Sequence, residues 1–190
     1  MLIQSWDPGS RRGAENTGVT THDSALVGSL GEGGHDLLDA RSIDGRSLTA
    51  IAREVKRAKA MGATIVIERQ FPGGRSGANP MDLERIILTR GTVLTVAEMV
   101  GVPVVQVFPA TWQAVVLRAV PMLPELCKVS AKTGRSRHDT KKAVAWLVER
   151  LYPGRLRNKD ERDAAGIGRW ACFTQDPNAP ALPARKARAA

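Results

Sequence analysis

The sequence predicts a single α/β domain built around a mixed sheet. Strand and helix patterns follow one another in the order βββαβαβαα. The first three strands are joined by short connections, which favours an antiparallel meander. Two later runs are rich in β-branched residues, as is typical of strands buried on both faces, and each precedes a helical pattern.

The five expected strands are short runs of apolar or β-branched residues bounded by turn-forming residues. The first ends at Asp7-Pro8-Gly9, and the fourth ends at Glu68 before a loop rich in glycine and proline. The strands are expected at Leu2–Trp6, Asn16–His22, Leu37–Ile43, Thr64–Ile67 and Val104–Phe108.

Helices are indicated where apolar residues recur three and four positions apart. The first begins after the N-cap Ser47 and ends at Gly62. The second has an apolar arc wide enough to pack on both the sheet and a partner chain. This second helix is expected at 80–100, and further helices are expected from Pro109, at Thr140–Leu151 and at Asp160–Phe173, with a basic loop at Lys128–Arg137. We divide the chain into a folded domain, residues 1–173, and a basic, disordered tail, residues 174–190.

The composition predicts a folded, cytoplasmic protein. Hydrophobic residues make up 43% and charged residues 25% of the chain, which excludes disordered and collagen-like classes. The most apolar stretch, Val100–Phe108, has nine residues, whereas a membrane span needs about 20. The first residues lack the pattern of a signal peptide. Cys127 and Cys172 have no pairing signature, and we expect reduced thiols.

The net charge of +9 is concentrated in one part of the chain. Residues 128–159 contain 10 basic and 2 acidic residues, whereas residues 1–127 contain 13 of each. A concentrated positive patch is typical of proteins that bind nucleic acid, although a solvated basic surface is the alternative.

Four acidic residues occupy positions where catalytic groups are often found. Asp7 and Glu68 end two strands, and Asp160 and Asp163 share one helix face because they are three residues apart. Four clustered carboxylates repel one another unless cations lie between them, and oxygen ligands favour Mg²⁺ or Mn²⁺. Two such ions can promote phosphodiester hydrolysis. Each acid taken alone also has a structural explanation. Asp7 can be a turn residue and Glu68 an ion-pair partner, and the two helical acids can stabilise the start of their helix by interacting with its dipole.

Four motifs, in this order, resemble the RuvC-type Holliday junction resolvases. They are Asp7-Pro8-Gly9-Ser10 with Asn16-Thr17-Gly18, Ile67-Glu68-Arg69-Gln70-Phe71, Lys141-Lys142-Ala143-Val144, and Asp160-x-x-Asp163-Ala164-Ala165 with a small-residue helix to Cys172. Trp6, Gly166 and Gly168 depart from the family pattern, so we interpret the chain as a divergent member of the kind that a phage or plasmid carries.

This resemblance implies a ribonuclease H-like fold, with a five-stranded mixed sheet flanked by helices, and a homodimer that nicks four-way DNA junctions symmetrically during recombination and repair. Asp7, Glu68, Asp160 and Asp163 would be the catalytic residues and would bind two Mg²⁺ ions per active site, which Mn²⁺ can replace. Phe71 would insert among the bases, and Lys141 and Lys132 would contact phosphate. The remaining residues assigned to DNA binding are Arg69, Arg75, Arg135, Arg137 and Lys142.

Two other functions remain open at this stage: a ribonuclease H-like nuclease acting on structured RNA or RNA–DNA hybrid, and a basic DNA-binding protein without catalysis. We expect Asp139 and Glu161 to be surface residues. The three histidines, His22, His35 and His138, have no metal-ligand spacing and are expected to be solvated or capping residues.

Overall fold

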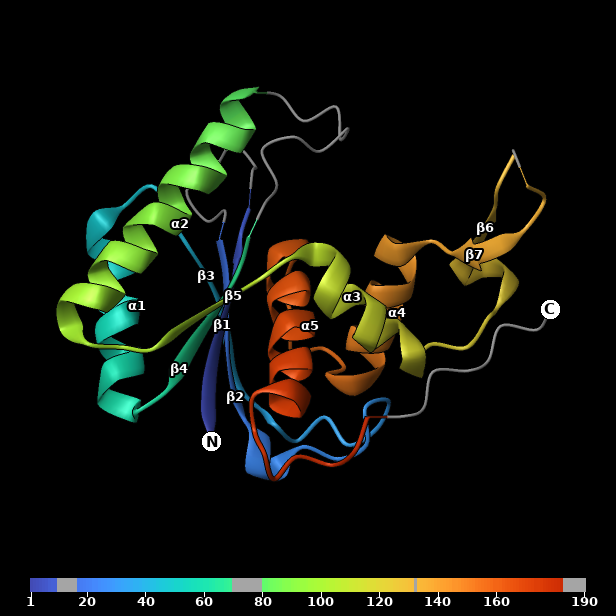
Figure 1. Ribbon diagram of the computed structural model, residues 1–190, viewed down its shortest axis with the longest axis horizontal. Helices are drawn as coiled ribbons and strands as arrows, with labels where there is room; N and C mark the ends of the chain where they lie inside the picture. Colours follow the sequence, from blue (N-terminus) through green and yellow to red (C-terminus); the bar gives the residue numbers. More distant parts are fainter. Residues whose placement is uncertain (10–16, 70–79, 132, 183–190) are drawn as a thin grey trace.

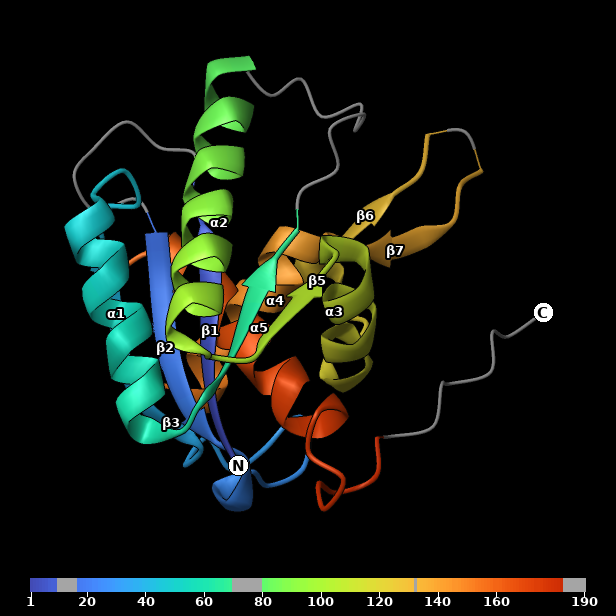
Figure 2. The same ribbon diagram turned by 60° about the vertical axis from the view of Figure 1, so that its left-hand side comes forward.

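The computed structural model describes residues 1–9, 17–69, 80–131 and 133–182 and has a five-stranded mixed sheet at its centre (Figures 1 and 2). The strand order is β3-β2-β1-β4-β5. Strand β2 is antiparallel to both β1 and β3, whereas β4 is parallel to both β1 and β5. The strands are β1 (Leu2–Pro8), β2 (Thr17–Asp23), β3 (Leu37–Ile43), β4 (Thr64–Glu68) and β5 (Val104–Val107). The meander and the mixed sheet are therefore confirmed.

Helices cover both faces of this sheet (Figure 1). Helices α1 (Leu48–Met61) and α2 (Pro80–Val100) cover one face, where Trp6 lies at the centre of an aliphatic core. The opposite face carries α3 (Pro109–Val116), α4 (Thr140–Leu151) and α5 (Lys159–Thr174) over a second core. Short 3-10 turns occur at Ser24–Leu26, Leu117–Ala119 and Pro124–Leu126.

The ends of α1 follow the sequence signals. The Ser47 side chain accepts a hydrogen bond from the Ala50 backbone N–H, which satisfies one of the free donors at the helix start. Gly62 ends the helix with a φ of 65°, a left-handed conformation that glycine adopts without steric cost.

The segment that we expected to be a basic loop contains a β-hairpin. Strands β6 (Cys127–Val129) and β7 (Ser136–His138) pair antiparallel, with Lys128 opposite Arg137. The strands are only three residues long and mostly exposed, so they lack the apolar alternation by which strands are recognised. The hairpin projects beyond α4 (Figure 2).

Helix α5 lies unusually close to the sheet because glycines remove side chains at the contact. A Cβ atom on Gly18 of β2 would be 2.0 Å from the backbone oxygen of Asp160. A Cβ atom on Gly168 would be 2.2 Å from Nε2 of His22. Gly168 thus stands at a place where only glycine lets the helix reach the sheet.

Within the described ranges, none of the helices combines the length and the apolar character that crossing a membrane requires. Beyond α5, Asp176 accepts a hydrogen bond from Ser24 and pairs with the N-terminal amine at 3.7 Å. Residues 183–190 of the expected tail lie outside the described residues. Cys127 and Cys172 are both free thiols, as expected.

Candidate active site

Asp7 and Glu68 meet at the ends of two neighbouring parallel strands. The β1–β4 register pairs Trp6 with Ile67, so Asp7 and Glu68 are the next residues along each strand. Side chains alternate along a strand, and the Ser5 hydroxyl donates to the Ala164 carbonyl at 2.8 Å, so Asp7 faces α5 as Ser5 does. Both acids are 6% exposed. The sheet therefore places two carboxylates side by side under α5.

The start of α5 brings the other two acids to the same place. Asp7 pairs with Gly18 across β1 and β2, and the Asp160 backbone lies directly against Gly18. Asp163 follows Asp160 by three residues, almost one helical turn. The helix start is fixed by Asn158, whose side chain accepts a hydrogen bond from the Glu161 N–H at 3.0 Å.

The pKa values of Asp7 and Glu68 are shifted by burial and by the charges of the other candidate acids. Burial raises the pKa of Asp7 well above its usual range, and the charges of Glu68 and Asp163 raise it further. Burial also raises the pKa of Glu68, to about 7, while a hydrogen bond from Trp112 offsets part of this effect. Lys159 lowers both pKa values by attraction.

Trp112 and Glu161 support the site, and neither role was predicted from the sequence. The Trp112 indole N–H donates to Oε2 of Glu68 at 2.7 Å, which fixes that carboxylate from α3. Glu161 was expected at the surface, and this was wrong: it is fully buried. It accepts hydrogen bonds from the Ser42 hydroxyl at 2.9 Å and from the Arg157 backbone N–H at 2.8 Å, and so ties the start of α5 to β3.

The donor set fits a hard divalent cation. All four candidate ligands are carboxylates, and ionising them together without a cation is unfavourable. In the part of the chain that the structure describes, the one group of three or more possible ligands with atoms within 4.8 Å of one another is His22, Asp36 and Cys172. Among the four acids, therefore, no three have ligand atoms that all lie within 4.8 Å of one another.

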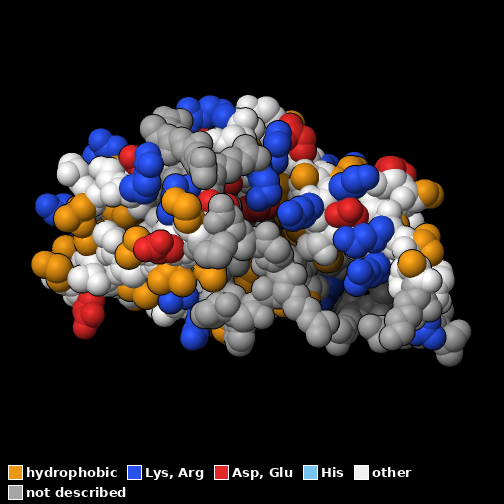
Figure 3. Space-filling view, turned by 90° about the horizontal axis from the view of Figure 1, so that it is seen from above, with side chains coloured by type: hydrophobic (Ala, Val, Ile, Leu, Met, Phe, Trp, Pro, Cys, Tyr) orange, Lys and Arg blue, Asp and Glu red, His pale blue; other side chains and the backbone are white. Residues whose placement is uncertain are grey.

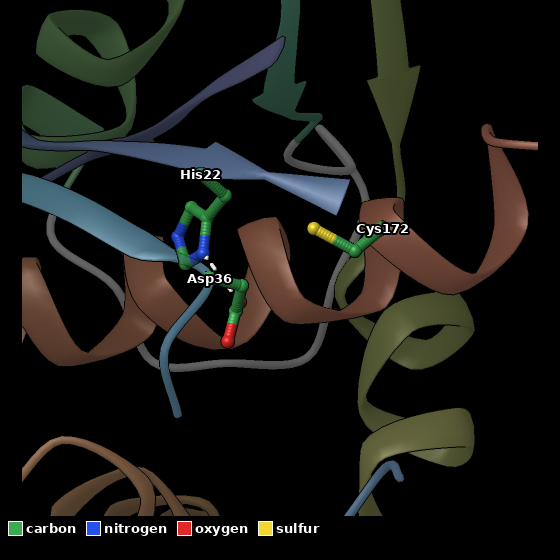
Figure 4. A group of neighbouring side chains, drawn as sticks. All are labelled: His22, Asp36 and Cys172. Carbon is green, nitrogen blue, oxygen red and sulfur yellow. Dashed lines mark hydrogen bonds and ion pairs between the residues drawn. The ribbon is translucent and has the colours of Figure 1, made fainter. Parts of the chain in front are cut away.

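The group formed by His22, Asp36 and Cys172 is a buried polar network rather than an open cation site (Figure 4). Asp36 already interacts with Nδ1 of His22 at 2.9 Å, with the Tyr152 hydroxyl at 2.9 Å and with the Arg169 guanidinium. Burial would raise the pKa of Asp36, but the His22 hydrogen bond and the Arg169 charge outweigh it and lower the pKa. A fully buried arginine thus supplies the positive charge that a metal ion would bring.

The expectation that all three histidines are solvated or capping residues was wrong for His22. Its side chain is fully buried and also hydrogen-bonds to Thr20 at 2.9 Å. His35 is exposed, and His138 interacts with the Pro121 carbonyl at 3.2 Å. Asp139 is a partly exposed N-cap of α4.

Lys and Arg side chains gather beside acidic ones on the face seen from above in Figure 3. Arg69 directly follows β4 and lies over the Phe108 ring, with 5.1 Å between the guanidinium carbon and the ring centroid. Four more of the residues assigned to DNA binding are exposed: Arg135 directly before β7, Arg137 on β7, and Lys141 and Lys142 on the first turn of α4. Phe71, Arg75 and Lys132 lie outside the described residues.

Known structures share this arrangement of strands and helices. The chain superposes with a TM-score of 0.59 on "T. thermophilus RuvC in complex with Holliday junction substrate", covering 92% of this chain and 95% of that one at 17% sequence identity. The fold is that of RuvC. A second structure, "Thermus thermophilus RuvC structure", also gives a TM-score of 0.59, with 18% identity over 92% of this chain and 96% of the other. No family model and no curated protein sequence matches the chain.

The RuvC fold confirms the ribonuclease H-like architecture that the motifs implied, with five strands in a mixed sheet and helices on both faces. At 17–18% identity, the similarity to RuvC is one of fold. What the site does must therefore be argued from its own residues.

Proposed function

We propose that this protein is a divalent-metal-dependent endonuclease that resolves four-way DNA junctions by paired nicks. One observation carries the proposal: two buried acids at adjacent strand ends meet two acids from the start of α5. The fold supports it, because the matching RuvC structure was solved with a Holliday junction substrate. The excess of basic residues between 128 and 159 supports a polyanionic substrate.

Asp7, Glu68, Asp160 and Asp163 would hold the metal ions, with Mg²⁺ as the expected ion and Mn²⁺ as a substitute. When bound, these ions would activate water and stabilise the charge on the leaving oxygen of a phosphodiester. The charges of Glu68, Asp163 and Asp160 all act on Asp7, so Asp7 would be the ligand best placed to be shared. Trp112 would keep Glu68 in one orientation through its hydrogen bond.

DNA would lie across the basic side chains near the acids. Lys141 and Lys142 at the start of α4 and Arg137 on the hairpin would contact phosphates, with Arg135 further along the hairpin and Arg69 at the end of β4. Phe71, Arg75 and Lys132 keep the roles that the sequence predicts for them. Affinity that rests on phosphate contacts should fall steeply as salt is raised.

Symmetric nicking requires two active sites, and we propose that a second copy of the chain supplies the other one. Helix α2 keeps large apolar side chains exposed, including Met81 at 52%, Leu88 at 62% and Met99 at 79%. Burying them between two copies would remove apolar surface from water. The cytoplasmic location stays a prediction.

The test is cleavage of a labelled four-way junction by purified protein, in Mg²⁺ and in chelator. We expect paired nicks at symmetric positions in Mg²⁺ only, and we expect Asp7→Asn to keep junction binding while losing at least about a thousandfold in cleavage rate. Asp176→Asn is the matched control, because Asp176 contacts the N-terminus at the opposite end of β1.

Competing substrates decide between the functions. A preference for an RNA–DNA hybrid over the junction would favour the other ribonuclease H-like activity. Binding without metal-dependent cleavage would favour a non-catalytic DNA-binding protein. Cleavage by Asp7→Asn at the wild-type rate would refute the assignment of the site.

A further inference from the structure

Lys159 places a positive charge among the four acids. It is the first residue of α5, and its Nζ atom lies 3.0 Å from Oδ2 of Asp163. Its charge also attracts Asp7 and Asp160, and it lowers the pKa of Glu68. A single ammonium group therefore interacts with every carboxylate of the candidate site.

Helix energetics do not account for a lysine at this position. The start of a helix carries partial positive charge, so it favours acids and disfavours lysine. A lysine that precedes an aspartate by four residues is also the less favourable order for such a pair. An acid or a neutral residue at this position would stabilise the helix more, whereas a cation reduces the repulsion among the four acids.

We propose that Lys159 is a built-in monovalent cation that replaces one of the two divalent ions, so that each site binds one divalent ion. This inference rests on the proposed function and changes its expected metal content. Asp7, Glu68 and Asp160 would hold the divalent ion, and Asp163 would stay paired with Lys159.

Competition for oxygen ligands explains why a second ion would be excluded. A divalent ion bound to Asp163 must displace the ammonium at 3.0 Å from its carboxylate. If the lysine kept its place, its charge would also repel that ion. Lys159 is 46% exposed, so its remaining N–H groups could also reach a phosphate of the substrate.

Isothermal titration calorimetry with Mn²⁺ tests this stoichiometry, with Mg²⁺ as a second titrant. The wild type should bind one ion per protomer, and Asp7→Asn should abolish this binding. Lys159→Met keeps the length of the side chain but removes its charge, and it should bind a second ion or bind the first at least about tenfold more tightly. Lys159→Arg should bind one ion, as the wild type does.

Arg162→Met is the matched control. Arg162 lies on the same helix, but its guanidinium pairs with Glu149 of α4 at 3.6 Å. This variant should bind metal as the wild type does. Circular dichroism melting curves establish that each variant is folded.

Two ions on the wild type would overturn the inference and leave the proposed function intact. Equal stoichiometry and equal affinity for wild type and Lys159→Met would overturn it in the same way. If the wild type binds no Mn²⁺ that depends on Asp7, the proposed function itself fails. The two failures are therefore distinguishable.

Discussion

Replacing Gly18 by alanine should push α5 away from the sheet where the Asp160 backbone lies against β2. The new Cβ atom would lie 2.0 Å from the Asp160 oxygen and 2.2 Å from its carbonyl carbon. Ordinary contacts of a Cβ atom begin near 3.4 Å, so the backbone would have to move by roughly 1.4 Å. The clash is with main chain inside a packed core, where no side-chain rotation can relieve it.

Overpacking of this kind costs about 1–3 kcal/mol, and we expect the upper end because backbone must move. With a urea m-value of about 2 kcal/mol/M, the midpoint of unfolding would fall by about 1.5 M. Urea unfolding followed by circular dichroism measures this shift. Because Asp160 moves away from Asp7, Mg²⁺ should also stabilise the variant less than the wild type.

Gly91→Ala provides the control within the same chain. Gly91 lies inside α2, and a Cβ atom there meets nothing within 4 Å. Alanine favours helix over glycine by about 0.5–1 kcal/mol, so this variant should be slightly more stable than the wild type. If Gly18→Ala unfolds at the wild-type midpoint, the close contact between α5 and β2 is not the constraint that we describe.

Three further predictions concern buried groups. In metal-free buffer, burial raises the pKa of folded Glu68 to about 7 against a usual value of 4.5, so Glu68 alone should lower the free energy of unfolding by about 3 kcal/mol as the pH rises between these values. Urea unfolding of the wild type and of Glu68→Gln at pH 5 and pH 8 isolates this contribution, which the variant should lack. Trp112→Phe leaves the Glu68 carboxylate without its indole donor and should cost about 1–3 kcal/mol, measured in the same assay at pH 8. Arg169→Met breaks the buried pair with Asp36 and should cost about 3–5 kcal/mol, whereas a loss below 1 kcal/mol would show that the network is not stabilising.

Most of the fold could be predicted because its signals are local. Caps, glycine stops and β-branched runs each act within a few residues, and they placed the central strands and most helices correctly. The β6–β7 hairpin was missed because its strands are short, exposed and basic. Its pairing leaves no apolar periodicity in the sequence.

The candidate site could be predicted only in part, because tertiary contacts decide its details. Asp7 and Glu68 stand out at strand ends, but nothing near Trp112 in the sequence signals its bond to Glu68, 44 residues away. His22 and Glu161 resemble surface residues locally, and their burial depends on partners far along the chain. The position of Lys159 could not be predicted either, because its charge comes near Asp7 and Glu68 only when α5 packs on the sheet.

The order in which the acids occur along the chain has a consequence for synthesis. Asp7 and Glu68 emerge early from the ribosome, whereas Asp160 and Asp163 arrive with the last helix. A growing or prematurely ended chain would carry only half of the carboxylates, whatever the state of its sheet. A metal site that needs all four carboxylates would thus form only when translation has passed α5.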